Sequence, residues 1–158
     1  MAAKKTVQLL IEKGFHISFA ESCTGGLCMA RLVEVPDASR VLDAGVVTYA
    51  DAAKVKYLNV LPKTIGQFGV VSEEVAGQMA KGVAQANGAQ VGVGVTGIAG
   101  PSGGTERKPV GMVCFGFYVD GALTTYTMQF GEIGRNAVRE ASVEFVYRTL
   151  EGLLGGGE

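Results

Sequence analysis

The feature that most limits how this chain can fold is the alternation of short, apolar, strand-like runs with helix-like runs. The expected strands are residues 15–20, 41–49 and 91–96, the expected helices are 4–13, 25–34, 52–58 and 72–87, and residues 62–69 are an expected loop. Helices that separate consecutive strands make those strands parallel, because each connection has to cross a face of the sheet. This part of the chain therefore predicts a parallel sheet with helices packed on it.

The C-terminal part adds an antiparallel hairpin and a long helix. Two strand-like runs, 110–119 and 122–130, are joined by Asp120-Gly121, a strong signal for a tight turn. A last helix is expected over 135–154, and the glycine tail 155–158 is expected to fray. The whole pattern predicts an α/β fold, a three-layer α/β/α sandwich with a mixed five-stranded sheet, in one domain over residues 1–158.

Composition excludes several classes of partner and site. The 158 residues are 47% hydrophobic and 18% charged, with a net charge of −1, which argues against nucleic acid or a membrane surface as the main partner. The N-terminal apolar run is too short to span a bilayer and lacks a signal-cleavage pattern, so we expect a cytoplasmic protein. Three cysteines and one histidine have no zinc-like spacing, so we expect reduced thiols and no structural metal. No cofactor is expected.

A serine at the end of the first strand is the candidate nucleophile. The stretch A-E-S-C-T-G-G-L-C-M at 20–29 leads from a strand through two glycines into a helix, which places the Ser22 hydroxyl beside unpaired backbone N–H groups. Such groups stabilise anions and developing oxyanions. We therefore expect Ser22 to attack a substrate that is also held by Thr24, Gly25 and Gly26.

The base that such a serine needs is not an obvious histidine. His16, the only histidine, begins the strand that ends near Ser22, which puts it roughly 20 Å away. Lys54 follows Asp51 in the first turn of a helix, where the macrodipole disfavours positive charge and favours a neutral amine. An ordinary solvated lysine is the alternative interpretation.

Other side chains are expected near the same edge of the sheet. Ser22, Tyr49 and Thr96 each end a predicted parallel strand, and ligands of open α/β sheets bind outside that edge. The Tyr49 hydroxyl could relay a proton or hold the serine, although a half-buried tyrosine bonded to water is more common. Cys23 could replace Ser22 as the nucleophile, although a small buried thiol beneath the turn is the simpler interpretation.

Glycines and cations further along the chain suit a phosphate or ribose. The strand V-G-V-G-V-T at 91–96 has glycines without side chains along one face, so a helix or a ligand can come very close to its backbone. Backbone N–H groups of the loop that opens with Thr96 and Gly97 could cradle a phosphate, although its pattern is neither of the two common nucleotide-binding fingerprints. Lys108 is a weaker candidate. Arg135 and Arg139, one helical turn apart, suit an anion unless they are simply solvated.

Several segments resemble the CinA C-terminal domain family, whose members include the nicotinamide-nucleotide amidases. They are A-E-S-C-T-G-G-L at 20–27, G-V-V-T-Y-x-x-x-x-K at 45–54, V-S-E-E-V-A at 71–76, and G-V-T-G-I-A-G-P-S-G-G-T with K-P-V-G within 94–111. The resemblance implies a hydrolase that converts nicotinamide mononucleotide to nicotinic acid mononucleotide and ammonia without a metal. It implies a fold similar to anticodon-binding domains, and it assigns the family's functional positions to Ser22, Tyr49, Lys54, Thr96 and Gly97.

Some members of that family carry a further N-terminal domain with pyrophosphatase activity, and we expect this chain to be the stand-alone amidase form. It departs from many relatives at Gly134, where they have an acidic residue, and in the turn 36–39. The rival hypothesis is a non-catalytic nucleotide-binding or regulatory domain linked to competence or DNA damage. A homodimer is expected only because many small α/β enzymes are symmetric oligomers.

Overall fold

A five-stranded mixed sheet forms the centre of the molecule, in a computed structural model that describes residues 2–155. The strands are β1 (Ile17–Glu21), β2 (Leu42–Val47), β3 (Val91–Gly97), β4 (Met112–Val119) and β5 (Ala122–Gln129). The helices are α1 (Ala2–Lys13), α2 (Leu27–Val33), α3 (Asp51–Leu58), α4 (Pro62–Phe68), α5 (Glu73–Asn87) and α6 (Arg135–Leu154), with a 3₁₀ turn at Ala38–Arg40. The expected fraying of the tail concerns residues 156–158, which lie outside the described residues.

The strand order, β2-β1-β3-β4-β5, confirms the predicted mixed sheet. β1 pairs in parallel with both β2 and β3, while β4 is antiparallel to its neighbours β3 and β5. The Asp120-Gly121 turn predicted the antiparallel pairing of β4 with β5. β2 follows β1 in the sequence and lies on one side of it, whereas β3, the next strand, lies on the other side of β1. A crevice for ligands is therefore expected beyond the carboxyl ends of β1 and β3.

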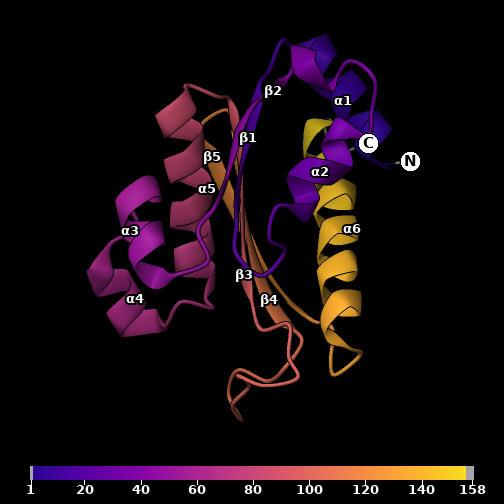
Figure 1. Cartoon of the computed structure of the whole chain (residues 1–158). Coiled ribbons are helices and arrows are strands. Elements are labelled where there is room, and N and C mark those ends of the chain that lie inside the picture. The colour runs from indigo at the N-terminus through magenta and orange to yellow at the C-terminus, as the bar shows by residue number, and fades with distance from the viewer. Residues whose placement is uncertain (1, 156–158) are drawn as a thin grey trace.

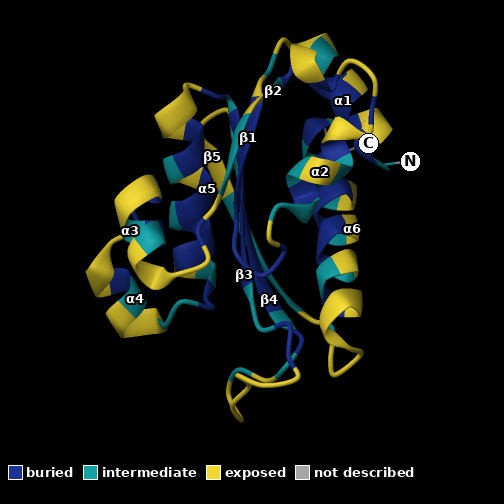
Figure 2. Ribbon diagram, in the orientation of Figure 1, coloured by how far each residue is buried: buried dark blue, intermediate teal, exposed yellow. Residues whose placement is uncertain are grey.

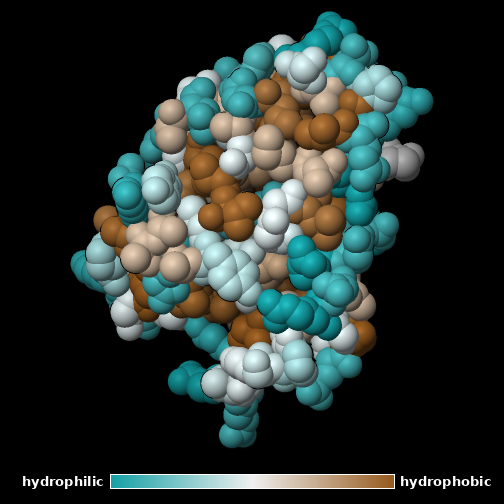
Figure 3. All heavy atoms as spheres, viewed as in Figure 1, coloured by the Kyte–Doolittle hydropathy of each residue, from teal (hydrophilic) through white to brown (hydrophobic). Residues whose placement is uncertain are grey.

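Helices cover both faces of the sheet, which gives the predicted three layers. α1, α2 and α6 lie on one face, and α3, α4 and α5 lie on the other (Figure 1). Buried residues line the strands and the sides of the helices that face them (Figure 2). On the face of the molecule seen in Figure 3, hydrophobic residues lie in several patches separated by neutral and hydrophilic ones. No helix within residues 2–155 is long and apolar enough to cross a membrane.

The bare face of β3 is occupied by helix α5. A Cβ atom on Gly92 would lie 2.1 Å from the carbonyl oxygen of Ala80, and one on Gly94 would lie 2.3 Å from that of Ala76. Such distances are too short for a side chain, so glycine is required at both positions. Of the two expected possibilities, a helix and a ligand, it is the helix that makes the close approach.

Two predicted boundaries are wrong for local reasons. Residues 62–68 form a helix rather than a loop, because Pro62 presets the helical φ at the first position and Gln78 of α5 donates a hydrogen bond to Thr64 at 2.9 Å. Helix α2 begins at Leu27 rather than at Gly25, because Gly25 and Gly26 have φ angles of +60° and +98°.

Candidate active site

The structure brings together the hydroxyl of Ser22 and the amine of Lys54. Ser22 directly follows β1, and Lys54 lies in the first turn of α3. The Lys54 Nζ atom lies 3.1 Å from Ser22 Oγ, 2.6 Å from the carbonyl oxygen of Thr48 and 3.4 Å from that of Tyr49. Two strand-to-helix turns thus meet at one pair of reactive atoms.

The surroundings of Lys54 favour its uncharged form. The side chain is only 1% exposed, and this burial lowers the pKa of its amine below the ordinary value, against the opposing negative charge of Asp51. Within residues 2–155, no carboxylate forms an ion pair with Lys54. Its partners are instead two backbone carbonyls and one hydroxyl, all of which can bond to a neutral amine.

Glycines shape the turn that carries Ser22. Gly25 and Gly26 both have left-handed backbone conformations, which a side chain would strain. The N–H of Gly25 donates to the carbonyl of Ser22 at 3.0 Å and closes the turn. Thr24 is completely buried, so neither its side chain nor its backbone is open to a substrate as the sequence suggested.

The start of α2 is not open to Ser22 in the way that the sequence suggested. The N–H groups of Cys28 and Met29 donate to the carboxylate of Glu21, at 2.9 Å and 3.0 Å. Glu21 is only 1% exposed and ties the end of β1 to the first turn of α2. Sequence reasoning missed this cap, because Glu21 precedes the helix by more residues than a capping box allows.

Arg139 contacts the nucleophile turn rather than an open anion site. Its Nε atom donates to the carbonyl of Cys23 at 3.1 Å, its Nη2 atom to that of Thr24 at 3.0 Å, and its Nη1 atom to Asn136 at 3.0 Å. These contacts engage all three guanidinium nitrogens. The sequence predicted that Arg139 would bind a substrate anion, and in this structure its partners are the backbone that follows Ser22 and the side chain of Asn136.

Tyr49 and Arg135 meet at the mouth of the crevice. Tyr49 is 61% exposed, and its hydroxyl accepts a hydrogen bond from Arg135 Nη2 at 2.9 Å. Arg135 Nη1 donates to the carbonyl of Gly100 at 2.7 Å. The Tyr49 hydroxyl makes no hydrogen bond to Ser22 or Lys54, so the expected proton relay through the phenol is not formed here.

A cleft of about 470 Å³ extends from these two residues along the glycine-rich loop. Its wall contains Tyr49, Val71, Ile98, Ser102, Lys108 and Arg135. Ser22 is 8% exposed and is not part of this wall, although Gly97, which ends β3, is. The cleft therefore offers an aromatic ring, apolar side chains and two cations close to the carboxyl edge of the sheet.

Thr96 and Lys108 form hydrogen bonds to the end of α4 and to the segment that joins it to α5, part of which lines the cleft. Thr96 is 1% exposed, and its hydroxyl donates to the carbonyl of Val70 at 3.1 Å, so it is not open to a ribose as the sequence suggested. The Lys108 amine donates to the carbonyl of Phe68. Both contacts fix the segment between α4 and α5, while Gly97 remains in the wall of the cleft.

The other candidate nucleophile and base lie apart from this chemistry. Cys23 is buried, and burial raises the pKa of its thiol to about 12, which fits the expected small buried thiol. His16 precedes β1, whereas Ser22 follows it, and its Nδ1 atom lies 2.6 Å from an oxygen of Asp43. Within residues 2–155, no group of three or more His, Cys, Asp or Glu side chains could hold a metal ion.

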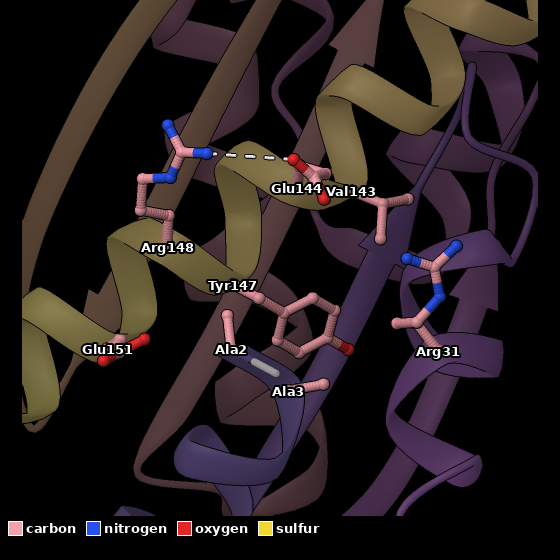
Figure 4. Close-up of a pocket in the computed structure, with 8 residues that line it drawn as sticks. All are labelled: Ala2, Ala3, Arg31, Val143, Glu144, Tyr147, Arg148 and Glu151. Atoms are coloured by element: carbon pink, nitrogen blue, oxygen red, sulfur yellow. Dashed lines mark ion pairs between the residues drawn. The ribbon is translucent and has the colours of Figure 1, made fainter.

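A second depression lies between α1, α2 and α6, and Figure 4 shows its lining. Its two cations already have acidic partners: Arg31 donates to Glu140 at 2.8 Å, and Arg148 pairs with Glu144 at 3.7 Å. Tyr147 points its hydroxyl toward α2, where it donates to the carbonyl of Cys28. The lining includes neither a serine nor a cysteine nor a lysine, so the candidate site is the Ser22 region.

Comparison with known proteins gives the family. A family model described as the CinA C-terminal domain matches residues 1–154. The chain belongs to the CinA C-terminal domain family. CinA-like proteins of Kosmotoga olearia and Dictyoglomus turgidum are 45% and 44% identical over 148 and 147 residues, which are 91% and 93% of this chain. The chain spans about a third of the length of these two relatives, 36% and 34%.

Solved structures of the CinA family share the fold over nearly their full length. The competence/damage inducible protein CihA from Agrobacterium tumefaciens is 39% identical, with a TM-score of 0.89 over 97% of this chain and 96% of that one. A CinA superfamily protein from Klebsiella pneumoniae is 33% identical, with a TM-score of 0.93 over 98% and 96%. The α/β architecture described above is thus that of the CinA family.

Proposed function

We propose that this CinA domain is a hydrolase that deamidates nicotinamide mononucleotide to nicotinic acid mononucleotide and ammonia. The observation that carries the proposal is the buried Lys54 amine within hydrogen-bonding distance of Ser22 Oγ. A nucleophile and a base in contact, next to an open cleft, are the minimum for covalent amide hydrolysis. The resemblance of the surrounding motifs to nicotinamide-nucleotide amidases supplies the substrate.

The acceptors around Lys54 suit a neutral base. An uncharged amine has two N–H donors and one lone pair, and the carbonyls of Thr48 and Tyr49 provide two acceptors. The lone pair is then left for the hydroxyl proton of Ser22, the third partner of the nitrogen. Burial lowers the pKa of Lys54, which increases the fraction of enzyme in this form.

In the first half of the reaction, Ser22 Oγ attacks the carboxamide carbon while its proton passes to Lys54 Nζ. The carbonyl oxygen of the substrate becomes an oxyanion, which unbonded N–H groups of the turn after Ser22 would stabilise. Lys54 then gives the proton to the amide nitrogen, the C–N bond breaks, and ammonia leaves an ester on Ser22.

In the second half, water attacks the ester carbon and gives a proton to Lys54. The C–O bond to Ser22 breaks, Oγ regains a proton from Lys54, and the carboxylic acid is released. The sum is one amide and one water converted to one carboxylate and one ammonium ion, with no change of oxidation state.

The cleft would hold the rest of the nucleotide. Tyr49 offers an exposed ring to a pyridine, while Arg135 and Lys108 place positive charge in the same wall. Arg135 is a candidate for a phosphate, because its present partners, a hydroxyl and a carbonyl, are uncharged and can be exchanged for an anion.

The test is ammonia release from nicotinamide mononucleotide, measured beside binding of the nucleotide by calorimetry. Wild-type protein should release ammonia, and Ser22→Ala should bind the nucleotide without releasing it. The matched control is Ser39→Ala, an exposed serine of the 3₁₀ turn that lies outside the cleft. Binding without ammonia release by the wild type would instead support a nucleotide-binding or regulatory domain.

A further inference from the structure

Two consecutive peptide units after Ser22 are held by one guanidinium group. Arg139 donates to the carbonyl of Cys23 at 3.1 Å and to the carbonyl of Thr24 at 3.0 Å. It reaches them from α6, across a large separation in sequence, and is itself partly buried. No other side chain of the described residues donates to these two carbonyls.

Because each peptide unit is planar, a contact that holds its carbonyl also fixes the direction of its N–H group. A trans peptide is planar, so its N–H points away from the group that its C=O contacts. In the unit between Thr24 and Gly25, the N–H points back into the turn and donates to the carbonyl of Ser22 at 3.0 Å. Arg139 is thus connected to the nucleophile residue through one peptide unit.

The other unit, between Cys23 and Thr24, forms a hydrogen bond through its carbonyl but not, among the described residues, through its N–H. Its carbonyl is bound by Arg139, and its Thr24 N–H makes no hydrogen bond to any of residues 2–155. Thr24 is 0% exposed, so this N–H is not open to a substrate, and the link from Arg139 to Ser22 runs through the Thr24–Gly25 unit.

We propose that Arg139 is a positioning residue that holds the peptide units after Ser22 and thereby fixes the position from which Ser22 Oγ attacks. The buried Glu21 carboxylate fixes the same turn from its other end, through the N–H groups of Cys28 and Met29. The inference rests on the proposed hydrolase function, and it removes Arg139 from the residues that contact the substrate phosphate.

The experiment compares Arg139→Gln and Arg139→Lys with wild type on two substrates, nicotinamide mononucleotide and nicotinamide riboside, which lacks the phosphate. Arg139→Gln should lower kcat on the order of 10- to 100-fold on both substrates, with little change in KM. Arg139→Lys, which keeps the charge, should recover part of the loss. Arg148→Gln, which removes an exposed arginine from the same helix, is the control.

A second readout keeps the inference testable if the nucleotide proves not to be a substrate. A fluorophosphonate forms a bond between Ser22 Oγ and phosphorus with loss of fluoride, and mass spectrometry gives its rate. This rate should fall by a similar factor in Arg139→Gln, while thermal unfolding shows that the variant is folded. If wild type is labelled but releases no ammonia, the proposed function fails while the labelling rates still decide the role of Arg139.

Two results would overturn the role of Arg139. One is a higher KM on the phosphorylated substrate alone, with kcat retained, because that is the signature of a phosphate ligand. The other is a folded Arg139→Gln variant whose Ser22 is labelled at the wild-type rate.

Discussion

The Nζ atom of Lys54 lies 3.1 Å from the Oγ atom of Ser22, although the two residues belong to separate strand-to-helix turns. The contact depends on the parallel pairing of β1 with β2, which brings the carboxyl ends of both strands to one edge. It also depends on burial, because a solvated lysine would remain charged and could not accept the serine proton. The fold therefore supplies the proximity, and its burial of Lys54 lowers the pKa of the amine, which favours the uncharged form.

Replacing Lys54 with methionine should remove activity while changing how stability depends on pH. The lowered pKa of Lys54 means that the folded protein binds this proton less well than the unfolded chain. Wild-type stability should thus rise with pH from the folded pKa up to the unfolded value, about 10.4. The measurement is the free energy of urea unfolding of both proteins between pH 7 and 10.5. The difference in favour of Lys54→Met should be smallest at the highest pH. A constant difference across this range would contradict the assignment.

Asp51→Asn should move the acid limb of the pH profile of kcat/KM to lower pH. The Asp51 charge raises the pKa of Lys54, so its removal lowers that pKa further. Because Asp51 is exposed, the shift should be modest, roughly a few tenths of a pH unit. Asp51→Glu keeps the charge and should leave the profile in place. A shift toward higher pH would show that Lys54 is not the group that titrates.

Tyr49→Phe should change substrate binding more than chemistry. The hydroxyl bonds to Arg135 and to neither member of the reacting pair, so kcat should stay within about threefold of wild type. Without the hydroxyl, Arg135 is no longer positioned in the cleft wall before the substrate binds, so KM should rise by roughly threefold to tenfold. A kcat that falls a hundredfold with KM unchanged would restore the phenol as a proton relay.

Gly94→Ala should destabilise the fold by about 3 kcal/mol, because its Cβ would overlap the carbonyl oxygen of Ala76 in α5. Gly66→Ala is the matched control: no atom lies within 4 Å of its Cβ, and alanine favours helix α4 by about 1 kcal/mol. Chemical unfolding compares the two variants. Equal stabilities would mean that α5 does not pack on β3 as described.

Much of the fold follows from local patterns in the sequence. The β-branched runs, the Asp120-Gly121 turn and the bare glycines of β3 each predict a local structure, and the strand order confirms their combination. Helix α4 was missed because its single proline also begins many loops, and only the contact between Thr64 and Gln78 of α5 distinguishes the two.

The candidate site was less accessible to such reasoning, because its key contacts join residues far apart in sequence. Strand ends predicted which edge Ser22 and Lys54 share, but not that Arg139 binds the backbone after Ser22 or that Glu21 caps α2. A charged residue gives no sign in the sequence of whether it faces a ligand or a carbonyl. Tyr49 and Thr96 were assigned to the right edge, but the partners of their hydroxyls depend on packing.

The protonation of Lys54 tests the central claim most directly. Nuclear magnetic resonance of the 13Cε and 15Nζ atoms, assigned by comparison with Lys54→Met, gives the titration midpoint of this amine. We predict a midpoint below the ordinary value of 10.5 that coincides with the acid limb of ammonia release. A midpoint at or above 10.5, or undiminished ammonia release by Lys54→Met, would contradict a neutral lysine acting as the base for Ser22.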